Sequence, residues 1–150
     1  MADVVDPATR SRMMSGIRGK NTKPELMIRK ALHARGFRYR LHCKLPGKPD
    51  LCLPKYRAVI FVHGCFWHGH DCHLFKWPST RPEFWREKIA RNKAVDAAAE
   101  AKLLADGWRV ATVWECALKG RARLDLENIT NRLGDWVTGS VDVLVIRGSV

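Results

Sequence analysis

Residues 63–72 read His-Gly-Cys-Phe-Trp-His-Gly-His-Asp-Cys, which places three histidines, two cysteines and two large aromatics in ten positions. They directly follow the apolar run 58–62. Thiolate and imidazole are ligands that Zn²⁺ prefers, and a structural zinc ion almost always takes four of them. The segment therefore indicates metal chemistry rather than ordinary core packing.

Three residues of this segment have the types and spacing of zinc ligands in one loop, namely Cys65, His70 and Cys72. The best fourth ligand is Cys116, because it follows a predicted strand from whose end a side chain can reach a loop leaving a neighbouring strand. A site closed by four protein ligands leaves no position for water, so the predicted zinc is structural. The alternative is a set of unrelated buried thiols and a surface histidine.

A hydrolytic site must then be sought beside the zinc. Asp50 opens the short apolar segment 51–53, and His63 ends the next predicted strand. If these strands pair, their ends bring together a carboxylate, a backbone carbonyl and an imidazole. Mg²⁺ takes oxygen ligands and binds phosphate oxygens, so this set suits cleavage of a phosphodiester. The ordinary alternative for Asp50 is a turn residue.

His68 is not needed for a zinc site with four ligands. An imidazole can act as a general base at neutral pH if a carboxylate or a carbonyl fixes its tautomer. Glu25 and Asp96, each on a predicted helix, are the acidic candidates for that support. The alternatives are a polar loop histidine and two exposed helical carboxylates, and a helix cap already explains Glu25.

The charge balance favours a polyanionic partner, with nucleic acid foremost, and the alternative is a generally basic, solvated surface. Lys and Arg number 27 against 15 Asp and Glu, which gives a formal net charge of +12. Phe66 and Trp67 occupy the ligand loop and Trp85 sits between charged residues. All three could stack on bases or wedge between them, although a single tryptophan more often packs in a core. A basic N-terminal stretch would add phosphate contacts through Arg10, Arg12, Arg18, Lys20 and Lys23.

The 150 residues suit one domain with a real core. No run of 18 apolar residues occurs and the N-terminus does not have the pattern of a signal peptide, so we expect a cytoplasmic protein. Five cysteines, an odd number, argue against a disulfide framework. We expect Cys43 and Cys52 to be buried free thiols.

The elements that must position these residues predict an α/β sandwich with a mixed sheet. Thr22 and Glu25 fit a capping box at the start of the second helix, and Gly36 ends it. The expected helices cover about 7–17, 22–36, 82–106 and 124–137. The expected strands cover 37–42, 50–53, 57–62, 108–114 and 141–146.

Several long segments also resemble one family in order along the chain. They begin with Asp-Pro-Ala-Thr-Arg-Ser-Arg at position 6 and Leu-Pro-Gly-Lys-Pro-Asp at 45–50. They continue with Tyr-Arg-Ala-Val-Ile-Phe-Val-His-Gly-Cys-Phe-Trp-His at 56–68, Arg-Pro-Glu-Phe-Trp at 81–85, Gly-Trp-Arg-Val at 107–110 and Val-Trp-Glu-Cys-Ala-Leu at 113–118. These residues resemble the very-short-patch-repair (Vsr) DNA mismatch endonucleases, and the likeness extends to about Trp136.

The resemblance implies a restriction-endonuclease-like three-layer sandwich with a mixed central sheet, an N-terminal helical arm over residues 1–20 and a structural zinc site. It implies an Mg²⁺-dependent enzyme that nicks one strand 5′ of the thymine in a T:G mismatch. Such mismatches arise when 5-methylcytosine deaminates, and the nick initiates very short patch repair. Mismatch-repair proteins and a repair polymerase are implied as partners of a monomer that acts at the nucleoid.

The resemblance also implies residue roles. Asp50 and the main-chain carbonyl of Val62 would bind Mg²⁺, with His63 close to the metal and its water. His68 would be the base or water-orienting group, supported by Asp96, with Glu25 nearby. The implied zinc ligands are Cys65, His70, Cys72 and Cys116. The residues implied to enter the duplex are Phe66, Trp67 and Trp85, with Met14 against the minor groove.

Val62 stands where a known family member has threonine, and a backbone carbonyl survives that change. Residues 139–150 show no useful match and remain unassigned. One alternative function is a restriction-type nuclease that cuts both strands, although no clear Asp/Glu-x-Lys follows the Pro-Asp at 49–50. The other is a zinc-stabilised DNA-binding module without catalysis.

Overall fold

The computed structural model describes residues 22–149. The predicted helix at 7–17, the arm at 1–20 and Met14 therefore lie outside the described residues. The helices are α2 (Lys23–Ala34), α3 (Pro82–Ala105) and α4 (Leu126–Thr138). The strands are β1 (Arg40–Leu41), β2 (Leu51–Leu53), β3 (Ala58–His63), β4 (Arg109–Trp114) and β5 (Val143–Ile146).

The five strands form one sheet in the order β1-β2-β3-β4-β5. The pairs β1–β2 and β2–β3 are antiparallel, whereas β3–β4 and β4–β5 are parallel, which confirms the predicted mixed sheet. In the parallel register His63 stands opposite Trp114. The chain therefore leaves β3 and β4 at the same edge, where the two predicted metal-ligand segments follow.

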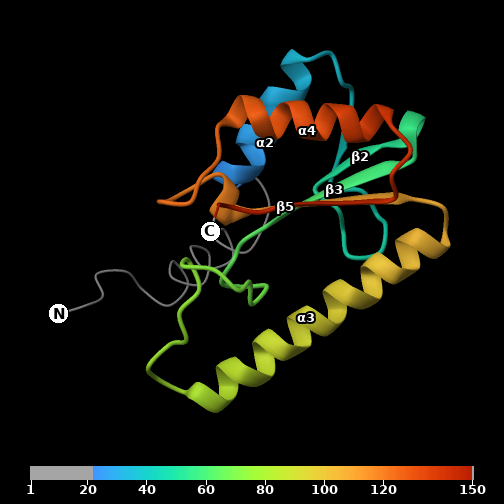
Figure 1. Ribbon diagram of the computed structural model, residues 1–150. Helices are drawn as coiled ribbons and strands as arrows, with labels where there is room; N and C mark the ends of the chain where they lie inside the picture. Colours follow the sequence, from blue (N-terminus) through green and yellow to red (C-terminus); the bar gives the residue numbers. More distant parts are fainter. Residues whose placement is uncertain (1–21, 150) are drawn as a thin grey trace, which may run out of the picture.

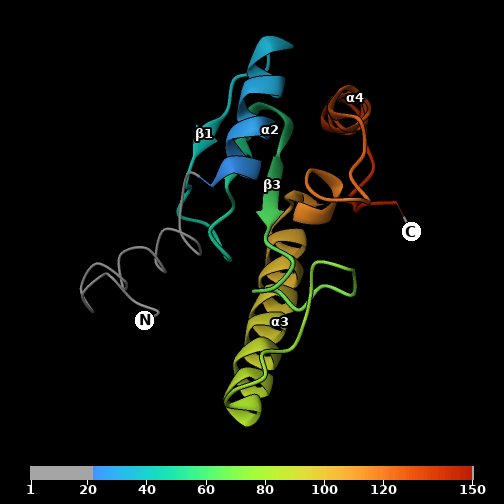
Figure 2. The same ribbon diagram turned by 90° about the vertical axis from the view of Figure 1, so that its left-hand side faces the viewer.

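Helices cover both faces of the sheet, in three layers (Figure 1). α2 and α4 pack side by side on one face, over a core that includes Ile28, Ile60 and Leu133, all fully buried. α3 lies across the other face, where Leu103 packs with Val59 and other strand residues. Figure 2 shows that α3 continues past the strand ends, beside the loop that connects β3 to α3.

The ends of the helices match local sequence signals. The Thr22 hydroxyl accepts a hydrogen bond of 3.4 Å from the Glu25 N–H, which confirms the predicted cap of α2. At the end of α4, the Arg109 guanidinium of β4 donates to the carbonyls of Trp136 at 2.8 Å and Val137 at 2.6 Å. Both carbonyls lie in the last turn of α4, where the Gly139 N–H also donates to the Trp136 carbonyl at 3.1 Å. Arg109 therefore adds hydrogen bonds to the helix end and joins α4 to the sheet.

Two expectations need correction. The strand expected over 37–42 covers only Arg40–Leu41, and the backbone of His42 turns into the left-handed region at φ 51° directly after it. Cys43 and Cys52 are not free thiols but form a disulfide, with their Cα atoms 6.4 Å apart. The odd cysteine count was misleading because three cysteines gather elsewhere, and the antiparallel β1–β2 pairing brings the remaining two together.

Among the described residues, no helix combines the length and the apolar character needed to cross a membrane.

Candidate active site and metal-binding cluster

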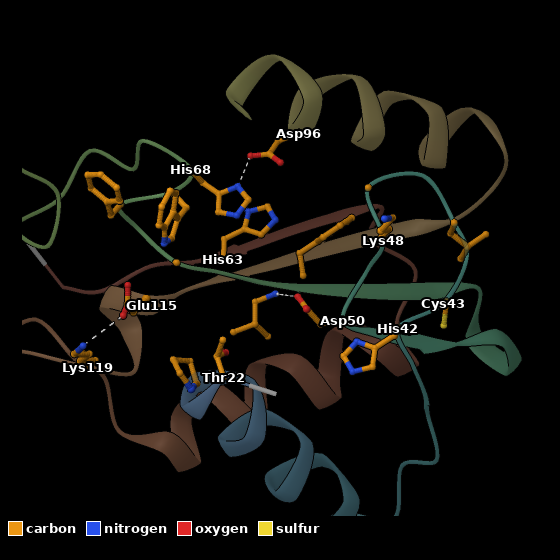
Figure 3. Close-up of a pocket in the computed structure, with 18 of the residues that line it drawn as sticks. Thr22, His42, Cys43, Lys48, Asp50, His63, His68, Asp96, Glu115 and Lys119 are labelled. Carbon is orange, nitrogen blue, oxygen red and sulfur yellow. Dashed lines mark hydrogen bonds and ion pairs between the residues drawn. The ribbon is translucent and has the colours of Figure 1, made fainter. Parts of the chain in front are cut away.

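A cavity of about 1220 Å³ opens at the edge of the sheet where β3 ends (Figure 3). Of the residues that the sequence nominated for catalysis, Asp50, His63, His68 and Asp96 line it, together with Val62. Phe66 and Trp67 also line it. The structure therefore brings together most of a candidate site, whose members come from β3, from α3, from the segment before β2 and from the loop between β3 and α3.

Asp50 is fixed by the neighbouring strand. Its carboxylate accepts a hydrogen bond of 2.6 Å from the Val62 N–H, and its own N–H donates to the Ile60 carbonyl at 3.1 Å. Burial raises the pKa of Asp50 from 3.8 to about 7; the Val62 hydrogen bond opposes this rise, and the nearby Glu25 carboxyl adds to it. A buried carboxylate is costly to ionise alone, and a bound cation would compensate for its lost hydration, so Asp50 is well suited to bind one.

Glu25 lies behind Asp50 rather than in the cavity wall. It is 1% exposed, and one carboxylate oxygen lies 3.1 Å from the Arg29 guanidinium and 3.8 Å from Nδ1 of His42. Arg29 and His42 also contact each other at 3.1 Å. Arg29 and His42 are site residues that the sequence alone did not indicate. The i,i+4 spacing of Glu25 and Arg29 on one helix was the only local signal for them.

His63, His68 and Asp96 form a second group, with one ligand atom from each within 4.8 Å of the others. The two imidazole rings stack with their centroids 3.8 Å apart and their planes 5° apart. Nδ1 of His68 lies 2.5 Å from an Asp96 carboxylate oxygen. Burial, with the neighbouring His68, lowers the pKa of His63 to about 3, so His63 is neutral at neutral pH.

Cys65, His70, Cys72 and Cys116 form the predicted cluster, with all four ligand atoms within 4.8 Å of one another. Nδ1 of His70 lies 3.4 Å from the Cys65 sulfur and 3.6 Å from the Cys116 sulfur. In a tetrahedral site with metal–ligand bonds of about 2.0 to 2.3 Å, ligand atoms lie about 3.5 Å apart. The cluster therefore fits a metal ion of the size and ligand preference of zinc.

Burial in this cluster raises the pKa of the Cys65 thiol and that of the Cys116 thiol. It also lowers the pKa of His70, whose ring stacks on Trp114 with centroids 4.0 Å apart. The cluster therefore favours uncharged ligands until a cation compensates for the lost hydration, and metal binding would release protons.

The C-terminal tail, unassigned from sequence, packs against this cluster. The Gly148 N–H donates to the Cys116 sulfur at 3.3 Å, and Arg147 donates to the Asp71 carbonyl at 2.6 Å. A Cβ atom at Gly148 would meet the Cys116 carbonyl oxygen at 2.5 Å. Ser149 follows with a 2.8 Å bond from its N–H to the Ala122 carbonyl. The tail therefore belongs to the support of the cluster.

Glu115 is a third site residue, after Arg29 and His42, that the sequence alone did not indicate. It lines the cavity, and its carboxylate accepts a 3.1 Å hydrogen bond from the Cys65 N–H, while Lys119 lies 3.6 Å from its other oxygen. Its position directly before Cys116 was the available signal. Glu115 ties the start of the ligand loop to the end of β4.

The predicted DNA-entering aromatics also meet. The Phe66 ring centroid lies 5.1 Å from Trp67 and 5.3 Å from Trp85, which extends from α3. Asn92, one turn before Asp96 on α3, donates to the Trp67 carbonyl at 2.8 Å. The same helix thus holds both the aromatic group and the carboxylate partner of His68.

The fold and these two groups define a class: an α/β protein with acid–base side chains, and a Cys/His cluster that could hold a metal ion, at one edge of a mixed sheet. The family profile described as DNA mismatch endonuclease Vsr matches residues 2–74. The DNA mismatch endonuclease Vsr of Escherichia coli is 49% identical over 140 residues, which cover 93% of this chain and 90% of that protein.

A type II nicking enzyme of Xanthomonas oryzae is 48% identical over 132 residues, covering 86% of this chain and 97% of the relative. Another, from Neisseria meningitidis, is 46% identical over 140 residues, covering 91% and 100%. The chain belongs to the Vsr family of DNA mismatch endonucleases. Its enzymatic class is therefore that of an endodeoxyribonuclease, as the resemblance predicted.

Proposed function

We propose that this protein nicks one strand of duplex DNA on the 5′ side of the thymine in a T:G mismatch, using Mg²⁺. Such mismatches arise when 5-methylcytosine deaminates, so the nick would initiate very short patch repair. The observation that carries the proposal is the His68–Asp96 pair, which faces the same cavity as the Asp50 carboxyl. Membership of the Vsr family supports the mismatch as the substrate.

Asp50 and the backbone carbonyl of Val62 would hold the Mg²⁺, a hard-ligand set that suits this ion. When bound, Mg²⁺ supplies positive charge to phosphate oxygens and lowers the pKa of a coordinated water. Glu25 supports Asp50 from behind, in contact with Arg29 and His42.

His68 is the proposed proton acceptor. The Asp96 carboxylate accepts a hydrogen bond from Nδ1–H, which leaves the lone pair on Nε2 to take a proton from the attacking water. The neutral ring of His63 stacks on the His68 ring in a nearly parallel plane and so limits the rotation of His68.

The remaining residues act on the DNA and on the loop. Phe66, Trp67 and Trp85 would enter the duplex beside the mismatch, where a weakened base pair lowers the cost of unstacking. Met14, in the proposed arm at 1–20, would face the minor groove. A structural Zn²⁺ held by the four-ligand cluster would fix the loop that carries His68 and the aromatics. The proposed zinc ligands are Cys65, His70, Cys72 and Cys116.

The described residues share one sheet and two helical layers, which supports a single domain of the restriction-endonuclease type. We propose that it acts as a monomer at the nucleoid, where its DNA substrate lies. Mismatch-repair proteins and a repair polymerase are the proposed partners that would use the nick.

The test compares two labelled duplexes that differ at one base pair, T:G or T:A, with purified protein and Mg²⁺. We expect one nick, in the thymine strand of the T:G duplex only. Asp50→Ala should abolish nicking while DNA binding persists, and Asp135→Ala, on the exposed side of α4, is the matched control. Equal cleavage of both duplexes, or cuts in both strands, would support a restriction-type nuclease. Binding without cleavage under any divalent metal would support a binding module.

A further inference from the structure

The aromatic group extends beyond the three rings proposed to enter the duplex. Phe75 stacks on Phe66 with ring centroids 5.7 Å apart, and Trp77 packs edge-on against Phe75 at 4.9 Å. On the other side, Phe84 packs edge-on against Trp85 at 5.2 Å. Six aromatic rings therefore form one connected group, centred on Phe66.

The outer rings of this group face solvent. Trp77 is 53% exposed and Phe84 is 41% exposed, and neither belongs to a hydrophobic core cluster of the described residues. Trp77 stands on the loop between β3 and α3, which projects beside α3 and away from α2 and α4 (Figure 2). Large apolar side chains grouped at a surface mark an interaction site rather than a packing requirement.

The charges around these rings indicate which kind of partner fits. Residues 76–91 contain five basic side chains and two acidic ones. The Arg81 guanidinium lies over the Phe84 ring, 4.4 Å from its centroid, and Lys76 is exposed directly before Trp77. Aromatic rings interleaved with basic side chains suit the sugars and phosphates of a nucleic acid.

We infer that Trp77 and Lys76 bind the DNA backbone that flanks the mismatch. The inference rests on the proposed function, because it takes Phe66 as the group that enters at the mismatch. The ring-to-ring steps of 5.7 Å from Phe66 to Phe75 and 4.9 Å from Phe75 to Trp77 allow Trp77 to lie up to about 10 Å from Phe66, a reach of up to about three base-pair steps in a duplex that rises about 3.4 Å per step. Trp77 therefore packs on a sugar of a flanking nucleotide, and Lys76 contacts an adjacent phosphate.

The test measures the dissociation constant of T:G duplexes by fluorescence anisotropy without divalent metal, so that the DNA stays intact. The long duplex has about ten base pairs on each side of the mismatch. In two shorter duplexes, one flank or the other is cut back to about two base pairs, which is shorter than three steps of about 3.4 Å. On the long duplex, Trp77→Ala should raise Kd about fivefold to tenfold, while Trp77→Phe keeps most of the affinity. On the duplex that lacks the contacted flank, Trp77→Ala should change nothing.

Two further variants separate charge from packing. Lys76→Ala should weaken binding to long T:G and T:A duplexes alike. It should also reduce the slope of the logarithm of the binding constant against the logarithm of the salt concentration by about one, the loss of one phosphate contact. Val141→Ala removes an exposed apolar side chain, 63% exposed, next to β5, and should leave both Kd values unchanged. Thermal unfolding of Trp77→Ala should match that of the wild type, because Trp77 is 53% exposed and belongs to neither core cluster of the described residues.

An unchanged Kd for Trp77→Ala on the long duplex would overturn the inference. An equal rise on long and truncated duplexes would also overturn it, because Trp77 would then act only by supporting Phe66. Failure of the proposed function gives a different result, because it would appear in the wild-type protein, which would then bind T:G and T:A duplexes equally. A failure of the inference alone leaves that discrimination intact and changes only the result for Trp77→Ala.

Discussion

Nδ1 of His68 lies 2.5 Å from a carboxylate oxygen of Asp96, and the two residues come from a loop and a helix 28 positions apart. The contact places the ring proton on Nδ1 and the lone pair on Nε2. A side-chain amide at position 96 would be isosteric but could present its N–H to the ring and favour the other tautomer.

Asp96→Asn should therefore lower the rate of the nicking step about 10²-fold, the usual contribution of a general base, while leaving DNA affinity unchanged. Single-turnover nicking of a T:G duplex at saturating Mg²⁺ measures this rate, and anisotropy measures the affinity. Asp135→Asn makes the same chemical change on the exposed side of α4 and should behave as wild type. A rate within twofold of wild type for Asp96→Asn would remove His68 from its proposed role.

Magnesium binding should depend on pH through Asp50. Burial raises the pKa of this carboxyl to about 7, so below that pH the folded protein holds a proton that Mg²⁺ must displace. The affinity for Mg²⁺ should therefore be about tenfold weaker at about pH 6 than at about pH 8, and should change little above that. Calorimetry in two buffers of different ionisation enthalpy should detect the released proton.

The control for this experiment is Asp50→Asn, which should lose both the magnesium binding and the proton release. Equal magnesium affinity at the two pH values would show that Asp50 is already ionised in the folded protein, contrary to the effect of its burial.

The Cys/His cluster should retain one metal ion through purification, and Cys116→Ser should lose it, together with part of the thermal stability. Elemental analysis of folded protein identifies the ion, which we expect to be zinc. Cys43→Ser lies outside the cluster and should keep the metal. Wild-type protein that is folded but metal-free would contradict the proposed zinc site.

Gly148→Ala should weaken metal retention without touching a ligand. The added methyl group would meet the Cys116 carbonyl at 2.5 Å and the Ala122 carbonyl at 2.9 Å, so the tail must move away from the Cys116 sulfur. Loss of such a supporting contact typically costs about tenfold or more in metal affinity. Metal release to a colorimetric chelator measures the effect. Ser149→Ala, which removes only a side-chain hydrogen bond, should release metal at the wild-type rate.

The Cys43–Cys52 disulfide predicts a thiol count. Protein unfolded without reductant, with a chelator present, should show three reactive thiols, those of the cluster, and five after reduction. Titration with a thiol reagent checks both numbers. Five thiols before reduction would mean that the pair is reduced in the isolated protein.

Local patterns predicted the elements well, because caps, breakers and apolar runs act over a few residues. The Thr22 cap, the long helix that begins at Pro82 and the β-branched strand before His63 all lie within a few residues of their predicted bounds. The cluster was predictable because three ligands fall in one loop, so only Cys116 had to be inferred from a strand end.

The contacts that were missed all depend on register between distant segments. The disulfide follows from the β1–β2 pairing, the contact of Glu25 with His42 from the approach of α2 to that hairpin, and the Gly148 hydrogen bond from the path of the tail after β5. None of these three contacts leaves a periodic pattern or a characteristic spacing in the sequence of either segment that makes it. Sequence reasoning could therefore name the reacting groups but not the residues that support them.

Cys65 and Cys116 are 51 residues apart in sequence, yet the Cys116 N–H donates to the Cys65 sulfur at 3.3 Å. They meet only because β3 and β4 run parallel in a register that sets His63 beside Trp114. During folding, the ligand loop alone offers three donors, and the fourth arrives when that long-range strand pairing is complete. Binding of a metal ion by all four side chains would therefore show that the central sheet has formed. It would also stabilise the parallel pairing of β3 and β4, because long-range strand pairing is the slow kind of contact to form.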